Sequence, residues 1–133
     1  MRRILVIEDD EPIAAILERG LGLAGYDVVV ETDGKDGQER WAVGGFAAVL
    51  LDVMLPGADG LDIAAERRAA GDATPVLLVT ARDDERLLRR AQQVGVDAVL
   101  VKPFEYRVLL ERVADLIARR AEPVAGAADR LDE

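Results

Sequence analysis

The chain has 133 residues, is half apolar in composition, carries a formal net charge of −9, and contains neither cysteine nor histidine. This length and apolar content are typical of one globular domain with a full core. Without cysteine and histidine, the chain can have no disulfides, no thiolate or imidazole metal ligands and no histidine general base. The negative net charge argues against direct binding of nucleic acid. We expect a cytoplasmic protein, since cysteine is absent and no apolar run reaches the ~20 residues of a membrane span.

Short apolar runs alternate with stretches of helical periodicity along the whole sequence. The apolar runs predict strands over residues 3–8, 27–31, 47–51, 76–80 and 96–101. The periodic stretches predict helices over about 12–24, 34–43, 59–70, 83–94 and 104–120. Glycine or proline follows most of these segments and marks where each ends.

Strands that alternate with helices predict a parallel sheet with helices on both faces. The expected fold is therefore a five-stranded doubly wound parallel α/β sheet, flavodoxin-like, with strand order 2-1-3-4-5. Its switch point lies between the first and third strands, where such sheets bind ligands. We expect residues 1–120 to form this domain, and residues 121–133, which lose periodicity, to be a flexible tail or the start of a linker.

Asp52 follows the apolar run 47–51 directly, and Pro56-Gly57 then breaks the chain. An apolar run without alternation is typical of a strand buried on both faces in a parallel sheet. Asp52 is therefore expected at the carboxyl end of a central strand, at the mouth of the crevice.

Polar residues end the other strands too, and a parallel sheet gathers these ends on one rim. The residues concerned are Glu8, Asp9, Asp52, Thr80 and Lys102. Each by itself is also explained as a helix cap, a turn residue or a solvated charge. Together, three carboxylates favour a bound cation, and an all-oxygen site suits magnesium.

The same set of residues is suited to phosphoryl chemistry. A carboxylate beside magnesium is a competent nucleophile for phosphorus. Lys102 could neutralise phosphoryl oxygens, the Thr80 hydroxyl could donate to another oxygen, and the small Ala81 leaves room for the incoming group. Such transfer depends on positioning and charge more than on acid–base groups, which fits a chain without histidine.

At this point the sequence resembles the receiver domain of a two-component response regulator, over residues 3 to about 120. The matching segments are Ile4–Glu11, Leu51–Gly60, Pro75–Arg82 and Val101–Phe104. The chain is similar to the branch that carries a winged-helix DNA-binding output domain.

The resemblance implies a signalling module rather than an enzyme acting on a separate substrate. Asp52 would accept phosphate from a histidine kinase, and the domain would slowly lose it again. Asp9 would ligate Mg²⁺ (Mn²⁺ could substitute) directly, Glu8 through water, and Met54 through its backbone carbonyl. Thr80 and Lys102 would hold the phosphoryl group. Phosphorylation would shift the face built by residues 83–120 and control an output. The expected output is transcription, with DNA bound only by an output domain outside this chain.

The sequence departs from the family pattern at the switch and at the interface. Val99 stands where the family commonly has an aromatic side chain that changes rotamer. A homodimer through residues 83–120 is the expected assembly. The residues considered for it are Leu87, Leu88, Asp97, Arg112 and Arg119. The two leucines stand where charges are usual, and we expect at least one of them to belong to the core.

Three other functions share parts of this pattern. A haloacid-dehalogenase-like phosphatase requires a second aspartate two residues after the nucleophile, where this chain has Met54. A nucleotide- or flavin-binding domain requires a glycine-rich phosphate loop after the first strand, where acids stand instead. A stand-alone or atypical receiver that acts as an interaction module with little or no phosphorylation stays open because of Val99.

Overall fold

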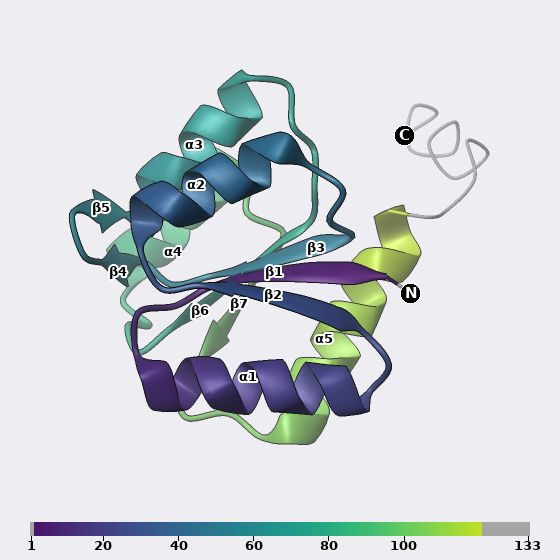
Figure 1. Ribbon diagram of the computed structural model, residues 1–133. Coiled ribbons are helices and arrows are strands. Elements are labelled where there is room, and N and C mark those ends of the chain that lie inside the picture. The colour runs from purple at the N-terminus through teal and green to yellow at the C-terminus, as the bar shows by residue number, and fades with distance from the viewer. Residues whose placement is uncertain (1, 121–133) are drawn as a thin grey trace, which may run out of the picture.

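The computed structural model describes residues 2–120, and the expected tail over 121–133 lies outside the described residues. Five parallel strands form the central sheet, in the order β2-β1-β3-β6-β7 (Figure 1). They are β1 (Arg3–Ile7), β2 (Asp27–Glu31), β3 (Ala48–Leu51), β6 (Val76–Thr80) and β7 (Ala98–Val101). This is the predicted strand order 2-1-3-4-5, with the switch point between β1 and β3.

Helices cover both faces of the sheet (Figure 1). One face carries α1 (Glu11–Leu23) and α5 (Tyr106–Arg120), and the other carries α2 (Gly34–Val43), α3 (Gly60–Ala69) and α4 (Glu85–Val94). Four of the helices begin after an aspartate whose side chain accepts a backbone N–H of the first turn. These aspartates are Asp10, Asp33, Asp59 and Asp84. Such caps fix where each helix starts, and therefore how long each loop at the strand ends is.

The core consists of two apolar layers, one on each face of the sheet. The layer under α2, α3 and α4 includes Trp41, Leu61 and Leu87. The layer under α1 and α5 includes Leu17 and Leu109. The residues of β3 and β6 are all buried, as expected for central strands of a parallel sheet.

The structure contains one element that the sequence did not predict. Met54–Leu55 (β4) and Ala58–Asp59 (β5) pair as a short antiparallel hairpin that projects beyond the carboxyl ends of the strands (Figure 1). Gly57 takes a φ of 68° in its turn, a conformation that glycine adopts without steric cost. Two-residue strands are too short to give a periodic signal, and so the sequence shows only a turn.

Most helix and strand ends lie within two residues of those predicted. The strand predicted over 96–101 begins at Ala98, and the helix predicted from Phe104 begins at Tyr106. No helix within residues 2–120 is both long and apolar enough to cross a bilayer.

Candidate functional site

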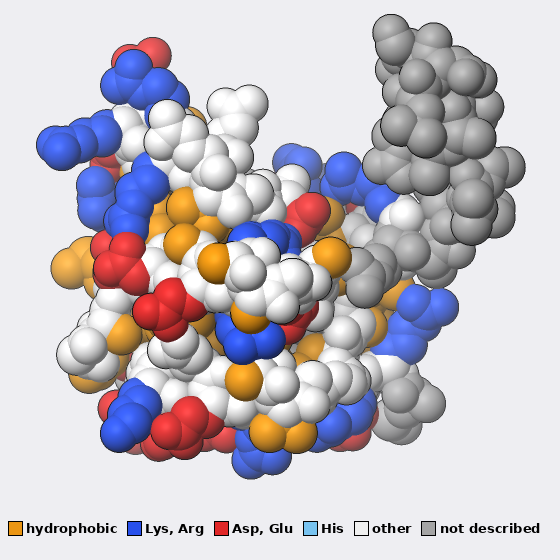
Figure 2. Space-filling model, turned by 90° about the horizontal axis from the view of Figure 1, so that it is seen from above, with side chains coloured by type: hydrophobic (Ala, Val, Ile, Leu, Met, Phe, Trp, Pro, Cys, Tyr) orange, Lys and Arg blue, Asp and Glu red, His pale blue; other side chains and the backbone are white. Residues whose placement is uncertain are grey.

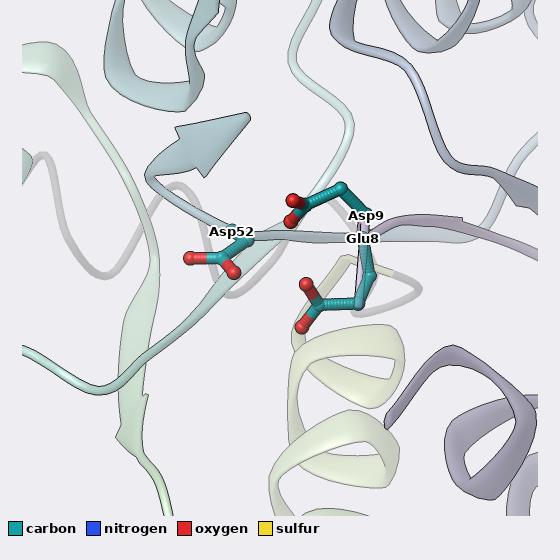
Figure 3. A group of neighbouring side chains, drawn as sticks. All are labelled: Glu8, Asp9 and Asp52. Carbon is teal, nitrogen blue, oxygen red and sulfur yellow. The ribbon is translucent and has the colours of Figure 1, made fainter. Parts of the chain in front are cut away.

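Three carboxylates meet at the ends of β1 and β3. The backbone N–H of Asp52 donates to the carbonyl of Ile7, which holds the two strand ends side by side. Oxygen atoms of Glu8, Asp9 and Asp52 lie within 4.8 Å of one another. Figure 3 shows their oxygens gathered on the same side of the two strand ends. The sequence prediction that these three side chains converge is confirmed by this geometry.

Lys102 reaches the same cluster from the end of β7. Its ammonium lies 2.6 Å from Glu8 Oε1 and 3.1 Å from Asp52 Oδ2. The backbone N–H of Lys102 donates to the carbonyl of Thr80, so the pairing of β6 with β7 sets the position of the side chain. These ion pairs join residues that are 94 and 50 positions apart in the sequence.

Burial changes the proton affinity of this cluster. Glu8 is only 1% exposed. Burial raises the pKa of the Glu8 carboxyl to about 7, with the Lys102 hydrogen bond opposing and the Asp52 carboxylate reinforcing that rise. Burial alone would lower the pKa of the Lys102 ammonium, but its hydrogen bonds to Glu8 and Asp52 outweigh burial and raise it.

Thr80 and Ala81 lie at the same rim, at the end of β6. Thr80 is 1% exposed, and its hydroxyl oxygen accepts the backbone N–H of Arg82 at 3.1 Å. Among residues 2–120, no hydrogen bond joins Thr80 to Glu8, Asp9 or Asp52. Ala81 is exposed and leaves the approach to the rim open.

The residues expected at the switch and the interface have different surroundings. Val99 is half-buried and packs against the layer under α2, α3 and α4. Leu87 is 3% exposed, which removes it from the expected interface, whereas Leu88 is 41% exposed. The expectation that at least one of the two leucines belongs to the core is therefore confirmed. Arg112 and Arg119 are exposed on α5.

Asp97 is engaged within the chain. Its Oδ2 accepts the backbone N–H of Val76 at 2.7 Å and pairs with Arg68 at 3.1 Å. The Arg68 guanidinium also donates to the carbonyls of Gly95, Asp72 and Thr74. One carboxylate oxygen of Asp97 is thus used inside the domain.

The cluster has the composition that a hard divalent cation requires. All its donors are carboxylate oxygens, and these favour Mg²⁺ or Ca²⁺ over softer metals. Asp9 is exposed and the Asp52 side chain is 12% exposed, so both are open to solvent on one side. Lys102 compensates one of three negative charges, and a divalent ion compensates the remaining two. The described residues therefore fit such an ion.

Gly60, the first residue of α3, lies against the backbone of the Asp52 segment. Its N–H donates to the Val53 carbonyl at 2.7 Å. A Cβ at Gly60 would lie 1.9 Å from the carbonyl oxygen of Asp52 and 3.1 Å from the Val53 Cα. Nothing in the sequence pattern revealed this contact, because it depends on the unpredicted β4–β5 hairpin.

We expect Gly60→Ala to lower the free energy of unfolding by about 1–3 kcal/mol, since the added methyl group must displace main-chain atoms. Urea denaturation of the purified domain measures this. Gly22→Ala is the matched control, because a Cβ at Gly22 meets nothing within 4 Å. That change in an exposed helical position should stabilise α1 by about 0.5–1 kcal/mol. Equal stabilities for the two variants would contradict the prediction.

The chain is similar to known proteins over most of its length. The family model described as "Response regulator receiver domain" matches residues 4–114. The chain is 41% identical over 110 residues to the uncharacterized transcriptional regulatory protein YkoG of Bacillus subtilis, covering 83% of this chain and 48% of YkoG. It is 36% identical over 125 residues to the transcriptional regulatory protein PcoR of Escherichia coli, covering 94% of this chain and 55% of PcoR.

Among solved structures, the receiver domain of the Francisella response regulator 1452 superposes with a TM-score of 0.85 at 28% identity, over 90% of this chain and 99% of that one. A doubly wound parallel sheet with an acidic cluster at its switch point defines a receiver-type signalling module. The chain belongs to the response regulator receiver domain family. It spans about half the length of the transcriptional regulators it matches.

Proposed function

We propose that Asp52 is the phosphoacceptor of a two-component signalling pathway and that it takes a phosphoryl group from a phosphohistidine of a histidine kinase. The observation that carries the proposal is the joint contact of Lys102 with Asp52 and Glu8, beside the three clustered carboxylates. One positive side chain and two neighbouring carboxylates thus flank the Asp52 carboxylate, which solvent can reach.

In the proposed step, an oxygen of Asp52 forms a bond to phosphorus while the bond from phosphorus to the kinase histidine breaks. A magnesium ion held by Asp9, Asp52 and the Met54 carbonyl, and by Glu8 through water, would neutralise phosphoryl charge. Lys102 moves its ammonium from the free carboxylate to a phosphoryl oxygen. The Thr80 hydroxyl, which accepts the Arg82 N–H in this structure, turns to donate its own proton to a second phosphoryl oxygen. The small, exposed Ala81 leaves space for the phosphoryl group.

The surface beside Lys102 supports a protein phosphodonor. An apolar groove of about 430 Å³ opens there. It is lined by Ile13, Ile16, Ala81, Lys102, Pro103 and Phe104. Ile16 is 62% exposed, so an apolar helix of the kinase can bury it while the kinase histidine reaches Asp52. Because a histidine kinase takes its phosphate from ATP, the proposal places this domain in the cytoplasm.

The proposed output is control of transcription by a winged-helix domain outside this chain. The relatives named as transcriptional regulatory proteins, and the half-length match to them, support this. We propose a homodimer through α4, β7 and α5, in which Leu88, Arg112, Arg119 and Asp97 contribute, the last through Oδ1, for which no hydrogen bond occurs within residues 2–120. Residues 1–120 are proposed as the receiver unit and 121–133 as a linker or tail.

A phosphodonor experiment separates this function from its alternatives. We would incubate the chain with acetyl phosphate, with and without Mg²⁺, and follow its intact mass. A lasting gain of one phosphoryl group that requires Mg²⁺ supports the receiver, and continuous phosphate release with no adduct supports a phosphatase. No adduct and no release, with acetyl phosphate or with a phosphorylated kinase, supports an interaction module.

We expect the Mg²⁺ affinity of the domain to rise with pH. The raised pKa of Glu8, about 7, means that its proton is mostly bound at pH 6 and mostly lost at pH 8. Mg²⁺ favours the deprotonated cluster, so binding should be roughly tenfold tighter at pH 8 than at pH 6. Calorimetry in two buffers of different ionisation enthalpy measures both the affinity and the released proton.

Glu8→Gln is the control for this pH dependence, because it keeps the side-chain shape and removes the titrating group. Its Mg²⁺ affinity should be weaker overall and almost independent of pH between 6 and 8. A wild-type affinity that is equally flat would contradict the assignment of Glu8. Asp9→Ala should weaken Mg²⁺ binding by at least about tenfold at every pH.

A further inference from the structure

Arg90 of α4 makes two ion pairs at the start of α3, one with its N-cap residue and one within its first turn, next to the Asp52 segment. Its guanidinium donates to Asp59 Oδ2 at 2.9 Å and also contacts Asp62. Asp59 is at the same time the N-cap of α3, accepting the Leu61 N–H at 2.8 Å, and the residue of β5 that pairs with Met54. A single carboxylate therefore connects α4 to the hairpin that follows Asp52.

The connection continues to Asp52 through rigid backbone. Asp59 is followed by Gly60, whose N–H is bonded to the Val53 carbonyl and whose Cα lies against the Asp52 carbonyl. No side chain lies between these main-chain atoms to absorb a movement. A displacement of the Asp52–Val53 backbone must therefore displace Gly60 and, with it, the Asp59 cap.

The pKa of the Asp59 carboxyl reflects its partners. Burial alone raises the pKa of the Asp59 carboxyl, but the hydrogen bonds from Arg90 and Leu61 outweigh burial and hold that pKa below its ordinary value. The left side of Figure 2, which is the side of the β4–β5 hairpin in Figure 1, shows basic side chains next to acidic ones. Among the residues next to this hairpin, Arg90 is paired with both Asp59 and Asp62.

The other end of the α3–α4 pair is closed by a second arginine. Arg68, near the end of α3, donates to the carbonyl of Gly95, the residue that caps the end of α4. Because both ends are joined, α4 follows a movement of the start of α3 rather than sliding away from it. Val99 of β7 is half-buried and cannot change rotamer as an aromatic side chain does. A coupling between Asp52 and α4 that does not pass through β7 is therefore important in this chain.

We propose that Arg90 is a positioning residue that couples the Asp52 segment to α4, through Asp59 and Gly60. The proposal rests on the proposed function of Asp52 as phosphoacceptor and names how its state reaches the output face. When the Asp52 backbone adjusts to a bound phosphoryl group, the Asp59 cap and its arginine partner move with it. Both partners are partly exposed, so the coupling should amount to no more than about fivefold in an equilibrium.

The test compares Arg90→Gln with Arg89→Gln. Arg89 is the matched control, since it is an exposed arginine on the same helix and no ion pair to it occurs within residues 2–120. Amide hydrogen exchange of α4 is measured in each protein with and without Mg²⁺ and beryllium fluoride, which mimics the phosphoryl group. In wild type and Arg89→Gln we expect α4 exchange to change on adding the mimic. In Arg90→Gln that change should fall by about half or more, while the mimic still binds.

A second measurement follows the coupling in the opposite direction, without any ligand. Backbone NMR shifts of Val53, Met54 and Gly60 should move in Arg90→Gln and stay in place in Arg89→Gln. An unchanged α4 response in Arg90→Gln, with the mimic bound, overturns the coupling and leaves the phosphoacceptor role intact. If wild type does not bind the mimic, the proposed function of Asp52 is wrong. The coupling proposal then fails with it, because it rests on that function.

Discussion

Replacing Asp52 with asparagine should abolish formation of the phosphoryl adduct. The amide is not a nucleophile for phosphorus, and the next carboxylates, Glu8 and Asp9, end a different strand. Intact mass spectrometry after treatment with acetyl phosphate and Mg²⁺ measures the result. Asp36→Asn, an equally conservative change on the exposed surface of α2, should retain the full adduct.

Loss of the adduct in Asp52→Asn should not be accompanied by unfolding. In this variant Lys102 still has its second partner Glu8, whose Oε1 lies 2.6 Å from the ammonium in the wild-type structure. The Asp52 carboxylate raises the pKa of Glu8, so its removal relieves repulsion inside the cluster. Urea denaturation should therefore show stability equal to or above that of wild type. A variant that folds and still gains one phosphoryl group would show that Asp52 is not the acceptor.

Replacing Lys102 with alanine should destabilise the domain and uncouple phosphorylation from output. Removing the cation leaves the buried Glu8 and the Asp52 carboxylate facing each other without a partner. We expect the metal-free protein to lose about 3 kcal/mol of unfolding free energy at pH 8. Lys35→Ala is the matched control, because Lys35 is the chain's other lysine and is exposed on α2.

The pH dependence of the Lys102→Ala defect has a definite sign. The Lys102 hydrogen bond lowers the pKa of Glu8, so its loss raises that pKa beyond its value in wild type. A group whose pKa is raised by folding stabilises the fold when protonated, and this stabilisation is lost as pH rises through the folded-state pKa. The stability deficit should therefore shrink between pH 8 and pH 6. Equal deficits at both values would contradict this account.

In the functional test of Lys102→Ala, phosphorylation stays measurable because Asp52 and the metal ligands remain. The phosphoryl oxygens lose the ammonium that we propose binds them, so the α4–β7–α5 face should not respond. Dimerisation of the phosphorylated variant, measured by analytical ultracentrifugation, should match that of the unphosphorylated protein. Dimerisation at the wild-type level after phosphorylation would refute the uncoupling.

The fold and the acidic cluster were predictable because local signals decide them. Apolar runs such as Val49–Leu51 require burial on both faces, and aspartates such as Asp33 cap the helices that follow. Once five parallel strands are recognised, their carboxyl ends must share one rim. Glu8, Asp9, Asp52 and Lys102 therefore had to meet, although up to 94 residues separate them.

Other features could not be predicted, because they depend on contacts between elements. Leu87 and Leu88 are identical neighbours in sequence, and only the packing of α4 buries one and exposes the other. The β4–β5 hairpin is too short for a periodic signal. The ion pair of Arg90 with Asp59 joins two surface charges that carry no local pattern.

The sequence by itself determined a parallel α/β sheet, the end of the sheet that carries the acids, and the chemical class of the site. These follow from patterns of burial and from the direction of parallel strands. Tertiary structure alone decided that Glu8 is enclosed and shares Lys102 with Asp52, and that Gly60 touches the Asp52 carbonyl. The reason is physical. Proton affinity depends on the solvent and the charges around a group, and close backbone contact depends on how two elements pack. Residues adjacent in sequence encode neither of these.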